Sequence, residues 1–242
     1  MLETNIKITP AGIFVEELDE RGGKSFKEIT LDDIQSVFEK TSIETPMLPT
    51  SCIYYNRSSG GNIWGGIFLI PPQKKAIHYT GRGSDAVFNI VAPIPYTMFG
   101  FVVRDGVIIH SYCTCVKYNP LENGDKHVTE TSLLSEVERQ NYGSGMSTPT
   151  FLFPYGNTWE DFRICWGNIN LPTVDSPADI PNIIDKFFEG ACNGDLFYTN
   201  SPLSFTDYMR NADGKETINN DDLFANNKTV QDFVNVIRRN MR

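Results

Sequence analysis

The stretch "FPYGNTWEDFRICWGN", residues 153–168, decides how this sequence is interpreted. It contains a polar turn around Asn157 and, eight positions later, a cysteine between Ile164 and Trp166. Two interpretations follow from these residues alone. Cys165 either fills space in a core strand, as cysteines commonly do because they behave as small apolar residues, or it is an accessible thiol for nucleophilic chemistry.

The composition predicts a folded protein with an acidic surface. The chain has 242 residues, of which 40% are hydrophobic and 12% aromatic, enough for the apolar core of one large domain. The formal net charge is -9, and the one short basic segment is "VIRRNMR" at 236–242. Because negative charge repels phosphate backbones, we expect no nucleic-acid partner.

The ends and the cysteine count bear on location. The start "MLETNIKITP" lacks the apolar region of a signal peptide, and no apolar run approaches the roughly eighteen residues of a membrane helix. The chain has five cysteines, an odd number. We therefore expect a cytoplasmic protein with reduced thiols and no membrane partner.

The first half of the chain reads as strands around one helix. Residues 5–17 predict two short strands around a Pro-Ala-Gly turn, and 30–41 predict an amphipathic helix capped by Thr30. Residues 52–118 are rich in β-branched and aromatic residues, which favour strands. Asp105-Gly106 inside this region is typical of a two-residue hairpin.

The second half predicts helices. Segment 127–140 fits a short helix or a lid, and 176–194 fits a helix with Ser176 as its cap, Pro177 in its first turn and Gly194 near its end. The polar tract 210–222 resembles a linker, and 229–240 predicts a final amphipathic helix. Strands followed by helices indicate the α+β class.

Metal and cofactor sites are not expected. His110 lies near Cys113 and Cys115, but in a strand the two cysteines share one face and the histidine takes the other. No second ligand pair completes a tetrahedral set. The glycine-rich segments 81–85 and 143–147 lack the lysine of a phosphate-binding loop.

The stretch quoted first resembles ubiquitin-conjugating enzymes, in which a His-Pro-Asn triplet and a brief turn precede the thioester cysteine. A closer likeness, over residues 148–190, is to the prokaryotic ubiquitin-conjugating-enzyme-like family D, typified by PRTRC system protein B. The shared features are a Thr-Pro lead-in, an aromatic pair or aromatic-small pair before Asn157, Gly167 two residues after Cys165, and an acidic aromatic helix. Tyr155 and Gly156 replace the His and Pro of the triplet, and no Trp-Pro pair follows the cysteine.

This resemblance implies a ubiquitin-conjugating-enzyme-like fold, an antiparallel β-meander flanked by helices. Residues 81–242 would form the core with its C-terminal helices. Residues 1–80 would be an N-terminal elaboration of the same domain or would include a small module ending near the loop at 42–51.

The resemblance also implies a function. Cys165 would accept a ubiquitin-like protein as a thioester from a ThiF-like activating enzyme and pass it to an amine, with a JAB-type peptidase as a further partner. Asn157 would donate to the oxyanion or hold the turn. Residues that would shape the site are Tyr155, Asp161, Trp166 and Gly167, and Glu160 or Asp175 are alternatives to Asp161 for assisting the amine. A second hypothesis is a non-catalytic adaptor that binds the ubiquitin-like protein or its activating enzyme.

Overall fold

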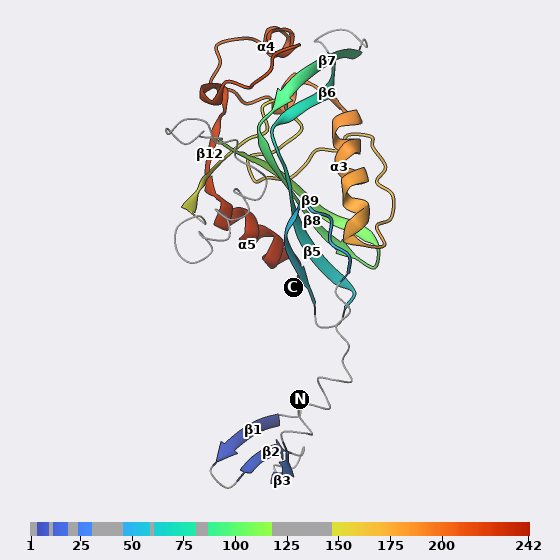
Figure 1. Cartoon of the computed structure of the whole chain (residues 1–242), viewed down its shortest axis with the longest axis vertical. Coiled ribbons are helices and arrows are strands. Elements are labelled where there is room, and N and C mark those ends of the chain that lie inside the picture. Colours follow the sequence, from blue (N-terminus) through green and yellow to red (C-terminus); the bar gives the residue numbers. More distant parts are fainter. Residues whose placement is uncertain are drawn as a thin grey trace. The chain divides into compact units, whose positions relative to one another are not determined.

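A computed structural model of the chain describes residues 4–9, 12–18, 24–30, 46–58, 61–80, 87–117 and 147–242 (Figure 1). The chain divides into two compact units, Met1–Pro46 and Met47–Arg242. The division falls inside the proline-marked loop at 42–51. The boundary predicted at residue 80 instead separates two strands that pair with each other along their length.

The first unit carries a three-stranded antiparallel sheet. Its order is β1 (Thr4–Thr9), β2 (Gly12–Leu18) and β3 (Lys24–Ile29). The two strands predicted over residues 5–17 are confirmed, and β3 is an additional strand. The helix predicted over 30–41 lies outside the described residues apart from Thr30.

The second unit is built on a six-stranded sheet whose neighbouring strands are all antiparallel. Its order is β12 (Ala225–Thr229), β10 (Pro149–Phe151), β9 (Val107–Val116), β8 (Tyr96–Arg104), β5 (Ile63–Ile70) and β4 (Cys52–Arg57). Asp105 and Gly106 join β8 to β9 with φ values of 49° and 78°. Two positive φ values match the twist of a tight hairpin, so the predicted turn is confirmed.

A smaller sheet lies beside this one in the same unit. It has the order β11 (Ala191–Cys192), β6 (Gln73–Thr80) and β7 (Val87–Ile94). β6 and β7 form an antiparallel hairpin inserted between β5 and β8, and β11 pairs parallel to the end of β6. This pairing brings Ala191 and Cys192, which lie inside the helix predicted over 176–194, next to β6.

Helices cover both faces of the six-stranded sheet (Figure 1). α3 (Ile180–Glu189) packs its apolar side on the face of the sheet that carries Phe99. α5 (Val230–Asn240) packs on the opposite face. Because both faces are covered, β5 and β8 carry near-continuous apolar runs instead of an alternating pattern. The α+β class is confirmed.

The ends of these helices follow their sequence signals. Ser176 is a cap, as predicted, and begins a short 3-10 turn, Pro177–Asp179, that leads into α3; it also forms a complete capping box with Asp179. α3 ends at Gly190, earlier than the predicted stop at Gly194. Thr229 caps α5 with a second capping box.

One helix was not predicted. α4 (Phe205–Ala212) begins after Ser204, whose side chain accepts from the backbone N–H of Asp207. Its last residues and the 3-10 turn Asn220–Asp222 lie within the tract 210–222, so the prediction of a linker there is wrong. The helix is short, and its polar composition resembles that of the loop that follows it.

α5 approaches the sheet closely where two strands carry glycine. A Cβ built on Gly100 would lie 2.6 Å from Cδ1 of Ile237, and one on Gly65 would lie 2.7 Å from Sδ of Met241. A larger residue at either position would force the side chain of Ile237 or Met241 to move. None of the described helices is both long and apolar enough to cross a membrane.

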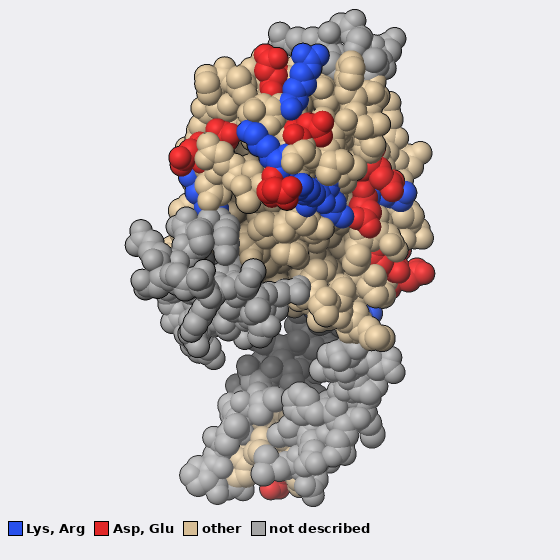
Figure 2. Space-filling model, turned by 45° about the horizontal axis from the view of Figure 1, so that its top comes forward, with Lys and Arg blue, Asp and Glu red and all other residues tan. Residues whose placement is uncertain are grey.

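Charged residues are mixed on the surface. On the face in Figure 2, the described Lys and Arg side chains lie among Asp and Glu side chains rather than in a field of one sign. Lys74 pairs with Glu216 and Lys75 pairs with Asp185, and these two ion pairs link β6 to later segments of the chain.

Candidate functional site

Residues 157–165 form a narrow hairpin with Cys165 at its base. The backbone N–H of Cys165 donates to the carbonyl oxygen of Asn157 at 2.8 Å, and Thr158 and Ile164 form an antiparallel bridge above it. A tight turn closes the other end, since the N–H of Phe162 donates to the carbonyl of Trp159 at 2.9 Å. Asn157 and Cys165 are therefore brought together by their backbones.

The hairpin adds to the edge of β9. The N–H of Cys113 donates to the carbonyl of Phe162 at 2.8 Å, and the N–H of Ile164 donates to the carbonyl of Ser111 at 3.1 Å. β10 pairs with the same strand only at Cys115. The segment that carries Cys165 thus continues the sheet where β10 stops.

Phe162 anchors this hairpin. Its side chain is fully buried and packs edge-on against Phe233 of α5, with ring centroids 5.1 Å apart. Its φ is 77°, a left-handed conformation that costs energy for a bulky residue. Lys228 of β12 lies over the same ring and donates to the carbonyl of Glu160 at 2.9 Å, so the strained turn is held from two sides.

Cys165 is half-buried, and its neighbours on either side are fixed. The indole N–H of Trp166 donates to Oγ of Ser111 at 2.7 Å, and the Trp166 ring lies edge-on to Phe187 of α3. Gly167 follows with a φ of 56°, and a Cβ built there would meet no atom within 4 Å. Cys165 is thus only partly buried, unlike Cys113, Cys115 and Cys192.

The other cysteines lie in different surroundings. Burial raises the pKa of the thiols of Cys52, Cys113, Cys115 and Cys192, and the last three are buried in the core. Such thiols stay protonated and are poor nucleophiles at neutral pH. Cys52 is half-buried, as Cys165 is.

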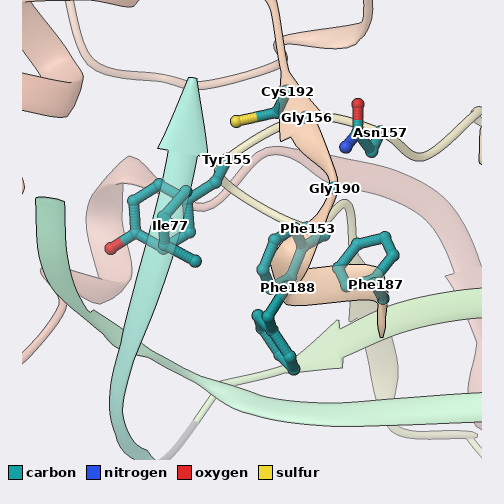
Figure 3. A pocket seen from close by; sticks show the side chains of 9 residues that line it. All are labelled: Ile77, Phe153, Tyr155, Gly156, Asn157, Phe187, Phe188, Gly190 and Cys192. Carbon is teal, nitrogen blue, oxygen red and sulfur yellow. The ribbon is translucent and has the colours of Figure 1, made fainter. Parts of the chain in front are cut away.

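The side chain of Asn157 faces a cleft and not a free oxyanion position. Its amide Nδ2 donates to the carbonyl oxygen of Ala191 at 3.4 Å, and its φ is 60°. Figure 3 shows Asn157 on one side of this cleft, near Gly190 and Cys192. The cleft has about 200 Å³ of space including its open mouth, and Cys165 is not among the residues that line it.

The remaining predicted residues split between core and surface. Tyr155 is buried, donates its hydroxyl to the carbonyl of Pro93 at 2.6 Å and has a pKa raised by burial, so it supports the segment from inside. Asp161 sits at the exposed tip of the hairpin and pairs with Arg163 at 2.7 Å. Arg163 also lies over the ring of Trp159, so these charged and aromatic side chains at the tip contact one another.

Sequence reasoning missed Ser111 and Phe162. Ser111 is one of several polar residues in β9, beside His110 and Thr114, and Phe162 is one aromatic residue among many, so neither carries a local signal for its role. The positive φ of Phe162 is imposed by its packing and not by its residue type, which disfavours it.

The structure assembles no metal site among the residues it describes. No group of three or more His, Cys, Asp or Glu side chains is close enough to hold an ion in that part of the chain. Cys113 and Cys115 are buried on the face covered by α3, and the His110 ring stacks on Tyr112, which packs on the face covered by α5.

Comparison with known proteins returns no relative. No protein-family model matches the chain, and no curated protein and no solved structure is significantly similar to it.

Proposed function

We propose that this protein is a ubiquitin-conjugating-like carrier that accepts a ubiquitin-like protein as a thioester on Cys165 and transfers it to an amine. One observation carries the proposal. Cys165 is only partly buried at the base of a hairpin whose opposite base residue is Asn157, and the two are joined by a 2.8 Å backbone hydrogen bond. The same order of asparagine, turn and cysteine is the basis of the resemblance to ubiquitin-conjugating enzymes and to the bacterial family D.

The arrangement of the second unit supports the proposal. An antiparallel meander of β4, β5, β8 and β9 comes first, the hairpin crosses the edge of β9, and α3 follows. The likeness of this order to the ubiquitin-conjugating fold belongs to the proposal, as does the grouping with family D.

The proposed chemistry is an exchange of thioesters. The Cys165 sulfur attacks the carbonyl carbon of a ubiquitin-like C-terminus that is already a thioester on a ThiF-like activating enzyme, where ATP supplied the activation. A new C–S bond forms, the old C–S bond breaks, and the Cys165 proton passes to the departing sulfur. An amine then attacks the same carbon, forms an amide and releases the Cys165 thiol.

Asn157 serves in this scheme by holding the turn. Its backbone carbonyl fixes the N–H of Cys165, and its φ of 60° suits asparagine better than most residues. Its side-chain amide donates a hydrogen bond to the carbonyl oxygen of Ala191, so a contact with an oxyanion would require that hydrogen bond to break.

The same side-chain bonds favour a second candidate, the non-catalytic adaptor. The Asn157 amide is taken by Ala191 and the Asp161 carboxylate by Arg163, which leaves neither side chain directed at an incoming amine. An adaptor would use the fold to bind a ubiquitin-like protein or its activating enzyme without forming a thioester.

A charging assay tests the proposal. The full chain is mixed with a ThiF-like activating enzyme, ATP and a β-grasp ubiquitin-like protein from the same genome, and run on gels with and without reductant. We expect a reductant-labile adduct that Cys165→Ala abolishes, that Cys165→Ser converts to a reductant-resistant one, and that Cys52→Ala leaves intact.

Two results contradict a carrier role for Cys165. One is an adduct that survives in Cys165→Ala. The other is no adduct when the activating enzyme is itself charged, which is checked on the same gel. In the second case, retained binding of either partner measured by calorimetry supports the adaptor.

A further inference from the structure

Ser111 bonds to the chain on both sides of Cys165. Its carbonyl oxygen accepts from the backbone N–H of Ile164 at 3.1 Å, and its Oγ accepts from the indole N–H of Trp166 at 2.7 Å. One residue of β9 therefore holds the position immediately before the thiol and the position immediately after it.

Two features make this contact more than a local bond. The Trp166 ring also packs edge-on against Phe187 of α3, with centroids 6.1 Å apart, so the indole is fixed by a strand and by a helix. The side chain of Trp166 is partly buried, and its N–H would lose its partner if the Ser111 hydroxyl were removed.

Trp166 is the first side chain after the cysteine that anchors the chain, and Ile169, which lies against Gly190, is the next. Gly167 has a positive φ and open space around it, and the next backbone bond joins the N–H of Ile169 to the carbonyl of Trp166 at 3.0 Å. The segment that leaves Cys165 is thus positioned first by Trp166, and Ser111 and Phe187 together hold Trp166.

We propose that Ser111 is a positioning residue for the Cys165 thiol, an inference that rests on the proposed carrier function. A thioester donor held by a second protein approaches from a fixed direction, so a small displacement of the sulfur slows the exchange. A small diffusing reagent approaches from any open direction and needs no such alignment. Ser111 therefore affects transfer between proteins much more than the intrinsic reactivity of the thiol.

The test compares Ser111→Ala, Trp166→Phe and the double variant in the full chain. Loss of one hydrogen bond of ordinary strength corresponds to about a fivefold to tenfold change, and we expect each single variant to slow charging of Cys165 by about that factor. The double variant should be no slower than either single one, because both remove the same bond. Ser111→Thr, which keeps the hydroxyl, should restore most of the rate.

Two controls separate positioning from general damage. Ser204→Ala removes the cap of α4, so it lowers stability without touching β9 or the hairpin, and it should charge at the normal rate. Alkylation of Cys165 by iodoacetamide, followed by mass spectrometry with a small thiol added as internal reference, should be at least as fast in Ser111→Ala as in the unmodified chain.

The outcomes distinguish this inference from the carrier function. If the unmodified chain charges and Ser111→Ala charges equally fast, or if alkylation and charging fall together, Ser111 is not a positioning residue. If the unmodified chain does not charge at all, the carrier function fails. Hydrogen exchange then decides on Ser111: faster exchange of the Cys165 amide and the Trp166 indole in Ser111→Ala supports the restraint, and unchanged exchange overturns it.

Discussion

The ring of Phe162 meets the ring of Phe233 edge-on, with centroids 5.1 Å apart and planes at 87°. Phe162 lies in the hairpin that ends at Cys165, and Phe233 lies in α5 near the end of the chain. The last helix therefore supports the candidate thiol although the two are distant in sequence.

Phe162→Ala should lower the free energy of unfolding by about 3–5 kcal/mol, the usual loss for a fully buried phenylalanine. Phe162→Gly should be more stable than Phe162→Ala by about 1 kcal/mol, because alanine at a positive φ is strained and glycine is not. The entropy of the unfolded chain alone would give the opposite order, with the glycine variant less stable than the alanine variant. Urea unfolding measures both differences, and an alanine variant that is the more stable of the two would show that the left-handed conformation is absent.

Asn157→Gly and Asn157→Ala separate the turn from the amide. Glycine accepts the φ of 60° freely, whereas alanine should lose about 1–2 kcal/mol of stability. If Asn157 holds the turn, the glycine variant keeps its rate of discharge from Cys165 to a free amine such as lysine. A loss of discharge of a hundredfold or more in the glycine variant, about the size expected for an oxyanion donor, would assign the amide a catalytic role.

Thr158 and Thr150 form a matched pair that measures how a buried hydroxyl affects the free energy of unfolding. The Oγ1 of Thr158 is buried without a partner among the described residues, whereas that of Thr150 donates to Oδ1 of Asn226 at 2.8 Å. Thr158→Val should therefore raise the free energy of unfolding by about 1 kcal/mol, and Thr150→Val should lower it by about 1–3 kcal/mol. A loss of stability in Thr158→Val would indicate a partner for that hydroxyl, such as a bound water.

Stability should fall as the pH rises above 9. Burial raises the pKa of Cys115 and of Cys192 to about 12 from the ordinary value of 9.0. Between these values the unfolded chain has lost protons that the folded chain keeps, so each thiol lowers the free energy of unfolding by up to about 1.4 kcal/mol per pH unit. Below pH 9 both states hold the proton and the contribution to the slope vanishes.

Cys192→Ala should reduce the slope of stability against pH in that range. Ile184→Val is the matched control, because it removes a buried methyl group, lowers stability at every pH and leaves the slope unchanged. Equal slopes in Cys192→Ala and the unmodified chain would mean that the Cys192 thiol ionises alike in the folded and unfolded states.

Local chemistry explains which elements could be predicted from the sequence. Asp105-Gly106 fixes a turn by its backbone preference, and Ser176 and Thr229 start helices by capping, so each signal acts within a few residues. α4 was missed because its polar composition resembles a loop and its burial depends on contacts with the distant strand β7. The parallel pairing of β11 with β6 likewise has no local signal.

The candidate site shows the same division. The spacing of Asn157 and Cys165 places both at the base of one hairpin, and that much follows from the order of residues. The direction of the Asn157 amide toward Ala191, the burial of Tyr155 and the contact of Trp166 with Ser111 are set by segments far away in sequence. Such tertiary contacts are determined by packing and leave no trace in a single sequence.

The hairpin that bears Cys165 also covers hydrogen-bonding groups of β9. β10 reaches this strand only at Cys115, so the carbonyl of Ser111 and the N–H of Cys113 are satisfied by the hairpin. If the hairpin detached, a strand with unpaired backbone groups would become available to another molecule, a well-known route to aggregation. Variants that loosen the hairpin should therefore precipitate on mild heating before the rest of the second unit unfolds, so solubility has to be checked before any loss of activity is interpreted.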